Sequence, residues 1–198
     1  MKRIVSTLLI FIGIVIICYP KLSEYYYTYK QKEIMKKLDL IYKNNIENSE
    51  DKTKLKTNNS NLQESNNNST CTIKIDKINL YQPILQGASQ ENLSVSIASI
   101  NTDVKPGQVG NYALAGHRSH TYGRNFNRLA EIEIEDKIKI FDGSQEYVYT
   151  VCEKFLVKPE ETWVLNSNKV DREITLITCN PMINPTGRLI IKGKIKWK

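Results

Sequence analysis

The stretch 173–181, Glu-Ile-Thr-Leu-Ile-Thr-Cys-Asn-Pro, decides both the fold and the chemistry that we expect of this chain. It has the apolar and β-branched composition of a buried strand, anchored by Leu176 and Ile177. We predict that the strand ends at Thr178, so that Cys179 stands where a loop begins. A rigid strand end holds a nucleophile better than a mobile loop does. The alternative is a structural cysteine, because free cysteines are often buried.

Similar strand-like segments, separated by turn residues, follow one another from residue 71 to the end of the chain. We expect seven or eight strands, the clearest of them at residues 72–75, 78–80, 111–115, 137–141, 146–157, 173–178 and 188–197. Asp142-Gly143 is a hairpin-turn signal between two of these strands. Short helices are expected around residues 125–130 and near 90–97. The sequence therefore predicts a mainly β domain, closed or sandwiched.

A histidine ends another of the predicted strands. The segment 111–117, Asn-Tyr-Ala-Leu-Ala-Gly-His, places His117 directly after Gly116, and the second histidine of the chain is His120. A free thiol has a pKa of about 8.5, so a nucleophilic cysteine needs an imidazole or a cation nearby at neutral pH. His117 is therefore the candidate partner of Cys179. The alternative is a surface loop with two solvated histidines; His120 is expected to be solvated or on the substrate side.

An arginine begins the last predicted strand. Arg188 lies nine residues after Cys179. Acyl transfer develops negative charge on a carbonyl oxygen, and a guanidinium can donate to that oxygen without losing its own charge. Arg188 is therefore the candidate oxyanion stabiliser. The alternative is an ordinary surface arginine.

The cysteine count argues for at least one free thiol. The chain has four cysteines and no Cys-x-x-Cys pair, a pattern that favours neither zinc binding nor thioredoxin-type chemistry. Cys18 lies in an apolar segment, so an odd number is left for the rest of the chain. A Cys71–Cys152 disulfide is not indicated, because nothing in the sequence fixes the distance between these residues.

Carboxylates cluster at residues 131–136, which read Glu-Ile-Glu-Ile-Glu-Asp. Such a group can bind calcium. Alternating carboxylates on the exposed face of a strand explain the pattern more simply. We therefore predict no metal site.

The N-terminal part of the chain predicts a membrane anchor and a tether. Lys2 and Arg3 precede an apolar run from Ile4 to Tyr19 with no small-residue cleavage site after it. We expect residues 1–20 to form an uncleaved signal anchor in the cell membrane, a single pass with the N-terminus inside and the remainder outside. Residues 21–70 are expected to form a stalk helix and then a disordered linker, and residues 71–198 the catalytic domain. The stalk has a weak apolar face of helical period, made of Ile34, Leu38 and Ile41.

The chain is basic, with a formal net charge of +7 and a pI of about 9.1. Nucleic acid is not the expected partner, because no zinc-finger spacing, RNA-binding aromatic motif or long run of lysine and arginine is present. An anionic cell envelope fits the predicted topology better, and a merely solvated surface fits as well.

Together these features resemble the sortase family over residues 73–197. The resemblance rests on Thr-Leu-Ile-Thr-Cys at 175–179, Gly-His at 116–117, Arg-Leu-Ile-Ile at 188–191, Pro-Gly-Gln-Val-Gly-Asn at 106–111 and Phe-Asn-Arg-Leu at 126–129. Family members often have Gly-Asp before the strand at 137–141, where this chain has Glu-Asp at 135–136. That is a turn position, and we expect no effect on catalysis.

The resemblance implies an eight-stranded β-barrel and an enzyme without a cofactor. The implied enzyme cleaves an LPxTG-like sorting signal near the C-terminus of secreted proteins, forms a thioacyl intermediate, and transfers the acyl group to a cell-wall peptide amine. Cys179, His117 and Arg188 fall on the catalytic positions of the family. Thr178 and Trp163 are predicted to contact the substrate, although Trp163 could equally be an ordinary half-buried tryptophan. The short chain with one anchor resembles the class D branch most and class A next.

Two other functions remain open at this stage. The first is a different extracytoplasmic cysteine peptidase or an L,D-transpeptidase-like acyl transferase. The latter usually has a Ser-His-Gly-Cys-like run, which is absent here. The second is an inactive surface-binding module, against which the presence of all three catalytic residue types argues.

Overall fold

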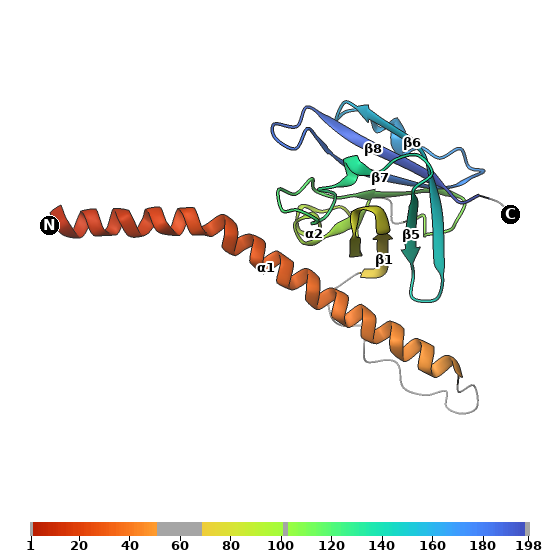
Figure 1. The fold of residues 1–198 in the computed structure, drawn as a ribbon, viewed down its shortest axis with the longest axis horizontal. Helices are drawn as coiled ribbons and strands as arrows, with labels where there is room; N and C mark the ends of the chain where they lie inside the picture. The colour runs from red at the N-terminus through yellow and green to blue at the C-terminus, as the bar shows by residue number, and fades with distance from the viewer. Residues whose placement is uncertain (1, 51–68, 101–102, 197–198) are drawn as a thin grey trace.

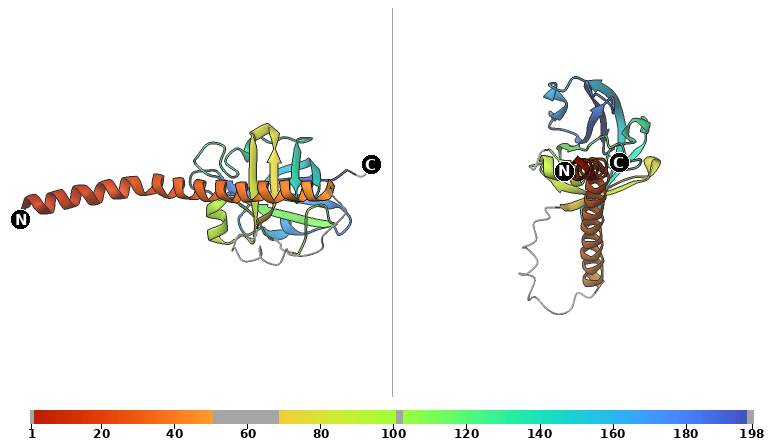
Figure 2. Two further views of the ribbon diagram at one scale, coloured as in Figure 1. Left: turned by 90° about the horizontal axis from the view of Figure 1, so that it is seen from below. Right: turned by 90° about the vertical axis from the view of Figure 1, so that its left-hand side faces the viewer.

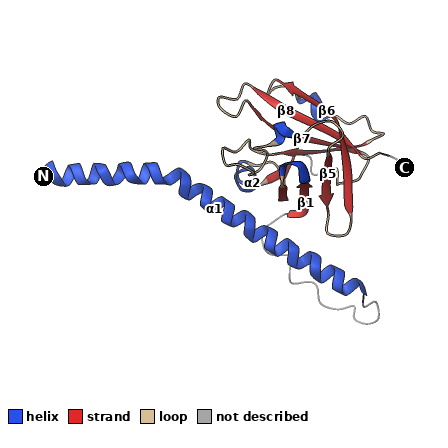
Figure 3. Cartoon of the chain, in the orientation of Figure 1, coloured by secondary structure: helices blue, strands red, loops and turns tan. Residues whose placement is uncertain are grey.

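The structure, a computed structural model, describes residues 2–50, 69–100 and 103–196. A long helix, α1 (Lys2–Glu50), runs past a β-barrel and projects well beyond it at its N-terminal end (Figure 1). Figure 3 shows that, apart from α1, the described helices are short pieces at the edge of the barrel. The prediction of a mainly β fold behind an N-terminal apolar helix is confirmed.

Eight strands close into a barrel in the order β1-β2-β3-β4-β7-β8-β6-β5. The β2–β3 and β4–β7 pairs are parallel, and the other pairs are antiparallel. The strands are β1 (Ser69–Ile75), β2 (Leu80–Gln86), β3 (Ile97–Ser99), β4 (Gly110–Ala115), β5 (Lys137–Phe141), β6 (Glu146–Val157), β7 (Arg172–Asn180) and β8 (Gly187–Lys194). The short helices are α2 (Gln90–Val95) and the 3-10 turns η1 (Asp76–Ile78), η2 (Leu129–Glu131) and η3 (Thr162–Leu165).

The barrel is filled by the inward-facing residues of its strands. In β5, Ile138 and Ile140 are fully buried, while Lys137 is exposed and Lys139 only partly covered. This alternation follows from the period of two in a strand. The same face of the other strands completes the core, through Ile73, Ile75, Leu114, Tyr149, Val151, Ile174, Leu176, Leu189 and Ile191.

Three expectations about local structure were wrong or incomplete. The predicted strand at 78–80 is mostly a turn: Ile78 ends η1, and Asn79 takes a left-handed conformation at φ 50° before β2 begins. The helix expected at 125–130 shrinks to η2, because Asn125 is also left-handed, at φ 46°. The helix near 90–97 ends at Val95, and β3, which was not predicted, follows from residue 97. Three residues are too few to show an alternating pattern.

One face of α1 packs on the barrel. The side chains of Ile34, Leu38 and Tyr42 are buried there, and the Tyr42 ring lies edge-on to Phe141, with 4.8 Å between centroids. The Gln31 amide nitrogen donates to the Val95 carbonyl oxygen at 3.2 Å and to the Ser96 hydroxyl at 3.1 Å. These contacts fix the barrel against the helix.

The buried face of α1 differs from the face that the sequence predicted for the stalk helix. Ile41 is 50% exposed, and Tyr42 takes the buried position that was assigned to it. The helix also continues through residues 44–50, where a tether was expected to begin, and β1 starts at Ser69 rather than at residue 71. The rest of the predicted linker, residues 51–68, lies outside the described residues.

The N-terminal part of α1 is apolar and exposed. It carries one candidate membrane span among the described residues, with a mean hydropathy of 1.7 and none of that window buried. Pro20 lies inside the helix, so the predicted boundary between anchor and stalk is not a break in secondary structure. The helix changes direction in its red-to-orange part in Figure 1, and a proline inside a helix is a physical cause of such a bend.

We expect Leu38→Ala to loosen α1 from the barrel. Deleting a buried leucine side chain costs about 2 kcal/mol or more, which would raise the undocked fraction about thirtyfold. The measurement is the rate of trypsin cleavage after Lys36 and Lys37 in the full chain held in detergent micelles. Leu40→Ala is the matched control, because Leu40 is 55% exposed on the same helix. Equal cleavage rates in the two variants would show that α1 does not rely on this contact.

Candidate active site

Three adjacent strands, β4, β7 and β8, bring the predicted catalytic residues to one end of the barrel. Cys179 of β7 lies directly opposite Arg188 of β8 in the antiparallel ladder. Directly opposed residues of such a pair project from the same face of the sheet, with Cβ atoms about 5 Å apart. The thiol and the guanidinium therefore leave the barrel wall on the same side.

The parallel pairing of β4 with β7 adds the histidine. Ala115 lies beside Ile177, and beyond the end of β4 the Gly116 N–H still donates to the Ile177 carbonyl oxygen at 3.1 Å. The Thr178 hydroxyl then donates to the Gly116 carbonyl oxygen at 2.8 Å. Continued past Gly116 by one more residue, this register would set His117 beside Cys179. The structure thus brings His117, Cys179 and Arg188 to one end of the barrel.

A glycine before the histidine has a steric reason. A Cβ atom on Gly116 would lie 2.7 Å from the ring of Phe126, which is fully buried. The Phe126 N–H donates to the His117 carbonyl oxygen at 3.1 Å. The loop after β4 is therefore folded tightly over the core, and its backbone holds His117 in place.

Cys179 sits slightly differently from the prediction. The strand does not stop at Thr178 but continues to Asn180, so Cys179 lies within its last two residues. Pairing with Arg188 and Gly187 extends β7 because β8 begins directly opposite. The thiol is free and partly buried. A cysteine inside a hydrogen-bonded ladder is held more rigidly than one in a loop.

Sequence reasoning missed a contact between the loop after His117 and the end of β7. An Arg118 guanidinium nitrogen donates to the Asn180 side-chain oxygen, in a short hydrogen bond. These residues directly follow His117 and Cys179, so the bond ties the histidine loop to the cysteine strand. No motif marks either residue, and only the β4–β7 register could have suggested the pairing.

The environment of His117 favours the neutral imidazole. His117 is exposed, yet the protein atoms around it remove part of its hydration. This desolvation, and then the positive charge of Arg124, lowers the pKa of His117 from its ordinary value. Arg124 is held near the histidine loop by donating to the Ser94 carbonyl oxygen at 2.8 Å. This direction favours the neutral imidazole over the imidazolium at neutral pH. His120 is exposed, as expected.

The two predicted substrate-contacting residues are placed differently. Thr178 is 2% exposed, and its hydroxyl is used to hold Gly116. Trp163 of η3 is 50% exposed and stacks on Phe155 of β6, with 5.6 Å between ring centroids. The Lys192 ammonium lies 5.9 Å from the indole. A substrate contact by either residue stays a prediction.

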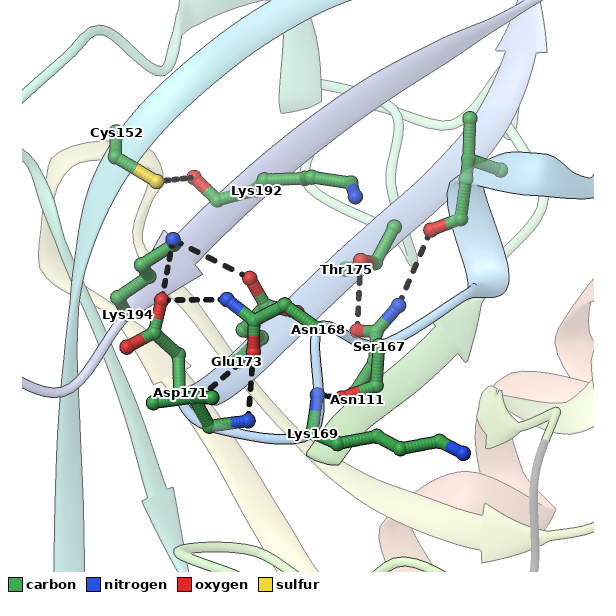
Figure 4. Close-up of polar contacts among 12 residues, drawn as sticks. Asn111, Cys152, Ser167, Asn168, Lys169, Asp171, Glu173, Thr175, Lys192 and Lys194 are labelled. Atoms are coloured by element: carbon green, nitrogen blue, oxygen red, sulfur yellow. Dashed lines mark hydrogen bonds and ion pairs between the residues drawn. The ribbon is translucent and has the colours of Figure 1, made fainter. Parts of the chain in front are cut away.

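Buried polar contacts fix the loop that carries Trp163 (Figure 4). The Asn111 amide of β4 donates to the Val164 carbonyl oxygen at 3.1 Å and accepts from the Thr175 hydroxyl of β7 at 2.8 Å. Asn111 is 2% exposed, so these bonds are shielded from water. The β6–β7 connection is thus attached to β4, which precedes His117, and to β7, which carries Cys179.

The other described cysteines lie away from this end of β7. Cys152 is on the outer side of β6, where its thiol contacts the Lys192 carbonyl oxygen at 3.5 Å (Figure 4). Partial burial, and then the negative charge of Glu153, raises the pKa of that thiol. Cys71 is buried in the barrel core, and Cys18 is on the exposed apolar part of α1. None of these three is placed as a nucleophile.

The carboxylate cluster is engaged with cations of the chain itself. The salt bridges are Glu131–Arg128 at 2.6 Å, Glu133–Lys77 at 2.6 Å, Asp136–Lys77 at 2.9 Å and Glu135–Lys196 at 2.9 Å. Among the described residues, no group of three or more histidine, cysteine and carboxylate side chains is arranged to hold a metal ion. The calcium alternative finds no support in this part of the chain.

We expect the pKa of His117 to lie below 6.5 and to rise in Arg124→Gln. A neighbouring cation disfavours the imidazolium, so removing its charge raises the pKa, while desolvation still keeps it below the ordinary value. NMR titration of the imidazole C–H signals measures both quantities. Arg124→Lys keeps the charge and is the control. A wild-type pKa at or above 6.5, or no rise in Arg124→Gln, would contradict the electrostatic account.

Comparison with known proteins identifies the family of this barrel. The family model described as Sortase domain matches residues 73–196. Sortase D of Bacillus subtilis (strain 168) is 25% identical over an alignment of 202 residues, which covers 98% of each protein. Sortase A of Bacillus anthracis is 33% identical over 123 residues, 62% of this chain, and the match spans only 58% of that protein.

Solved structures agree with the sequence comparison. Listeria monocytogenes sortase A has a TM-score of 0.62 at 28% identity, covering 66% of this chain and 88% of that one. A Clostridium perfringens Sortase D5 transpeptidase has a TM-score of 0.66 at 23% identity, covering 84% and 98%, a likeness that bears on the fold alone. The full-length alignment with a sortase D includes α1, as expected of the class D branch. The chain therefore belongs to the sortase family.

Proposed function

We propose that this protein is a sortase transpeptidase that cleaves an LPxTG-like sorting signal and transfers the acyl part to a cell-wall amine. The observation that carries the proposal is the shared register of three strands. Cys179 is paired directly with Arg188, and Gly116, which precedes His117, is hydrogen-bonded to the strand that carries Cys179. A nucleophile, a proton-transfer group and a cation meet at one end of a rigid barrel, as acyl transfer requires.

The proposed acylation uses Cys179 and His117. The Cys179 thiolate attacks the carbonyl carbon after the threonine of the sorting signal, and a carbon–sulfur bond forms. The carbon–nitrogen bond of the peptide then breaks, and the leaving amine takes a proton from the His117 imidazolium. A thioacyl-enzyme remains. Dividing one difficult step into two easier ones is the general advantage of covalent catalysis.

Deacylation reverses these roles. An incoming amine attacks the thioester carbon and gives a proton to the neutral His117 imidazole. The carbon–sulfur bond breaks and returns Cys179 as a thiolate. Because its lowered pKa favours the neutral imidazole of His117 at neutral pH, only a minor fraction of molecules is ready for acylation. Turnover is accordingly slow.

Arg188 is proposed to stabilise the oxyanion in both steps. Its guanidinium arises from the residue directly opposite Cys179, and one of its terminal nitrogens donates to the Gly187 carbonyl oxygen at 3.0 Å. That bond leaves the other N–H groups of the planar guanidinium available to donate hydrogen bonds to a carbonyl oxygen bound at Cys179. The positive charge persists at every pH at which the enzyme works.

The β6–β7 connection is proposed to shape the substrate groove. It begins after Val157, which pairs with Arg188, and it carries Trp163. The exposed indole, stiffened by its stack on Phe155, offers a flat apolar wall for the peptide. The proposed partners are secreted proteins with a sorting signal and a peptide amine of the cell wall. Membership of the sortase family sets aside the L,D-transpeptidase alternative.

The proposed location is the cell membrane, crossed once. Lys2 and Arg3 before the apolar run place the N-terminus inside, and the barrel then lies outside the cell. The supporting observation is the apolar first part of α1, which is exposed along its length. The barrel packs on the second part of the same helix and is therefore held close to the outer surface of the membrane.

We expect Cys179→Ala to abolish cleavage of a sorting peptide without changing the melting curve, because Cys179 is the described cysteine that pairs directly with Arg188. Cys152→Ala is the matched control: it removes a thiol from the wall of the same barrel and should retain activity. Product formation is followed by mass spectrometry. A Cys179→Ala variant with more than trace activity and a normal melting curve would assign the nucleophile elsewhere.

We expect Arg188→Lys to lower kcat/KM by about 10²-fold or more, the range seen when one oxyanion donor is removed. The charge survives in this variant, but the planar fork does not. Steady-state kinetics with the sorting peptide is the measurement, and an unchanged melting temperature is the control for folding. Near wild-type kinetics would show that Arg188 does not stabilise the oxyanion.

We expect an amine to intercept the thioacyl intermediate. With a sorting peptide and a high concentration of oligoglycine or a similar wall-peptide amine, a new amide product should form in competition with hydrolysis. Mass spectrometry distinguishes the amide from the free acid. Formation of the hydrolysed peptide alone, with every amine tried, would make this protein a peptidase.

A further inference from the structure

The end of the barrel that carries the candidate active site faces the membrane part of α1. In Figures 1 and 2 the green loop between β4 and β5 lies on the side of the barrel toward the apolar N-terminal half of the helix. The contacts of Gln31, Leu38 and Tyr42 with the barrel fix this arrangement. The orientation of the catalytic end relative to the membrane is therefore built into the fold.

A groove lies between the helix and the histidine loop. It has a volume of about 540 Å³, and it is lined by the first turns of α1 after the apolar run and by the loop that begins at His117. Because one wall belongs to the anchor helix and the other to the candidate active site, an occupant of the groove would contact both.

The groove is predominantly cationic. Lys21, Arg118 and Arg124 line it, and Glu24 is the one carboxylate among its lining residues. Glu24 lies 3.7 Å from the Arg124 guanidinium and neutralises only part of this charge. The Nε atoms of Arg118 and Arg124 are buried and have no hydrogen-bond acceptor among the described residues. These two atoms are covered by the protein, so what the groove offers an anion is the positive charge of Lys21, Arg118 and Arg124.

The groove also lies at the level of the lipid headgroups. Lys21 is the second residue after Tyr19, which ends the apolar run. That run of sixteen residues covers about 24 Å as a helix, slightly less than the hydrocarbon core of about 30 Å. The shortfall of about 6 Å corresponds to four residues, so the backbone reaches the interfacial zone from about residue 24 onward, and the long side chain of Lys21 can extend to it. Tyr25 and Tyr26 are 72% and 58% exposed there, as aromatic residues at a membrane interface are.

We propose that this groove binds the phosphate of an anionic lipid headgroup in the outer leaflet. The lipid would bridge α1 and the histidine loop and hold the catalytic end against the membrane surface. Cys179 would then lie at the same distance from the membrane as substrates and acceptors that are themselves held in it. The inference rests on the proposed anchoring of α1 but not on the identity of the nucleophile.

The test uses the full chain in non-ionic detergent micelles, titrated with phosphatidylglycerol and followed by native mass spectrometry of the one-lipid adduct. Lys21→Gln should weaken binding about fivefold, the effect of one cation near a membrane surface. Glu24→Gln should strengthen binding by a similar factor, because it removes the opposing charge. Lys36→Gln is the matched control, since it makes the same change on an exposed residue of the same helix, about 22 Å further from the membrane.

Opposite effects of Lys21→Gln and Glu24→Gln, with Lys36→Gln unchanged, would support the proposal. An equal loss in Lys36→Gln would overturn it, because the attraction would then be spread over the whole surface. Equal binding of zwitterionic phosphatidylcholine, or full displacement by millimolar glycerol phosphate, would likewise overturn a site for an anionic lipid.

A separate control distinguishes failure of the anchor from failure of the site. Membranes carrying the full chain are washed with carbonate, and intact cells are treated with protease. Retention in the membrane together with digestion of residues 21–198 supports the topology on which the inference rests. Release by carbonate, or protection from the protease, would overturn the anchoring and the lipid site together while leaving the chemistry of Cys179 untouched.

Discussion

The parallel pairing of β4 with β7, carried one residue further by Gly116, is the constraint on which the rest of the site depends. Two hydrogen bonds extend it: the Gly116 N–H to the Ile177 carbonyl oxygen, and the Thr178 hydroxyl to the Gly116 carbonyl oxygen. The second bond is buried, and an unpaired polar group there would cost about 1–3 kcal/mol. The register of the two strands is therefore strongly fixed, and with it the neighbourhood of His117 and Cys179.

The pairing of β7 with β8 likewise sets Arg188 opposite Cys179. The Arg118–Asn180 hydrogen bond then connects the loop after His117 to the end of β7. Cys179 and Arg188 are thus placed by ladder hydrogen bonds of the closed barrel, and His117 lies in a loop whose backbone is hydrogen-bonded on both sides of it. The Phe126 ring, packed where a Cβ of residue 116 would lie, explains why glycine precedes the histidine. Pre-organisation of this kind is what an acyl-transfer site needs.

Much of the barrel could be predicted because long amphipathic strands carry a clear alternation. β5 and β6 have the bounds expected from the sequence, β4 and β8 each begin one residue earlier, and β8 ends at Lys194 rather than at residue 197. The three catalytic candidates were found from their places at strand ends. β3 was missed because three residues show no period, and η1 replaced a strand because Asn79 accepts a left-handed conformation.

Contacts set by tertiary packing could not be predicted. The choice of Tyr42 over Ile41 on the buried face of α1 depends on where Phe141 lies, and the Arg118–Asn180 bond depends on the register of strands far apart in the sequence. The continuation of α1 through Pro20 is of the same kind. Proline costs a helix about 3 kcal/mol or more, and local propensity alone argues for a break there. Docking of the helix on the barrel beyond that point offsets this cost.

The most direct test of the account is to capture the covalent intermediate. The full chain is mixed with a sorting peptide, quenched in acid within the first turnover, digested, and examined by mass spectrometry. The account predicts that the acyl part of the peptide is attached to Cys179 and is released by hydroxylamine, as a thioester is. An acyl group on any other residue, or turnover without an adduct on Cys179 at any time, would contradict it.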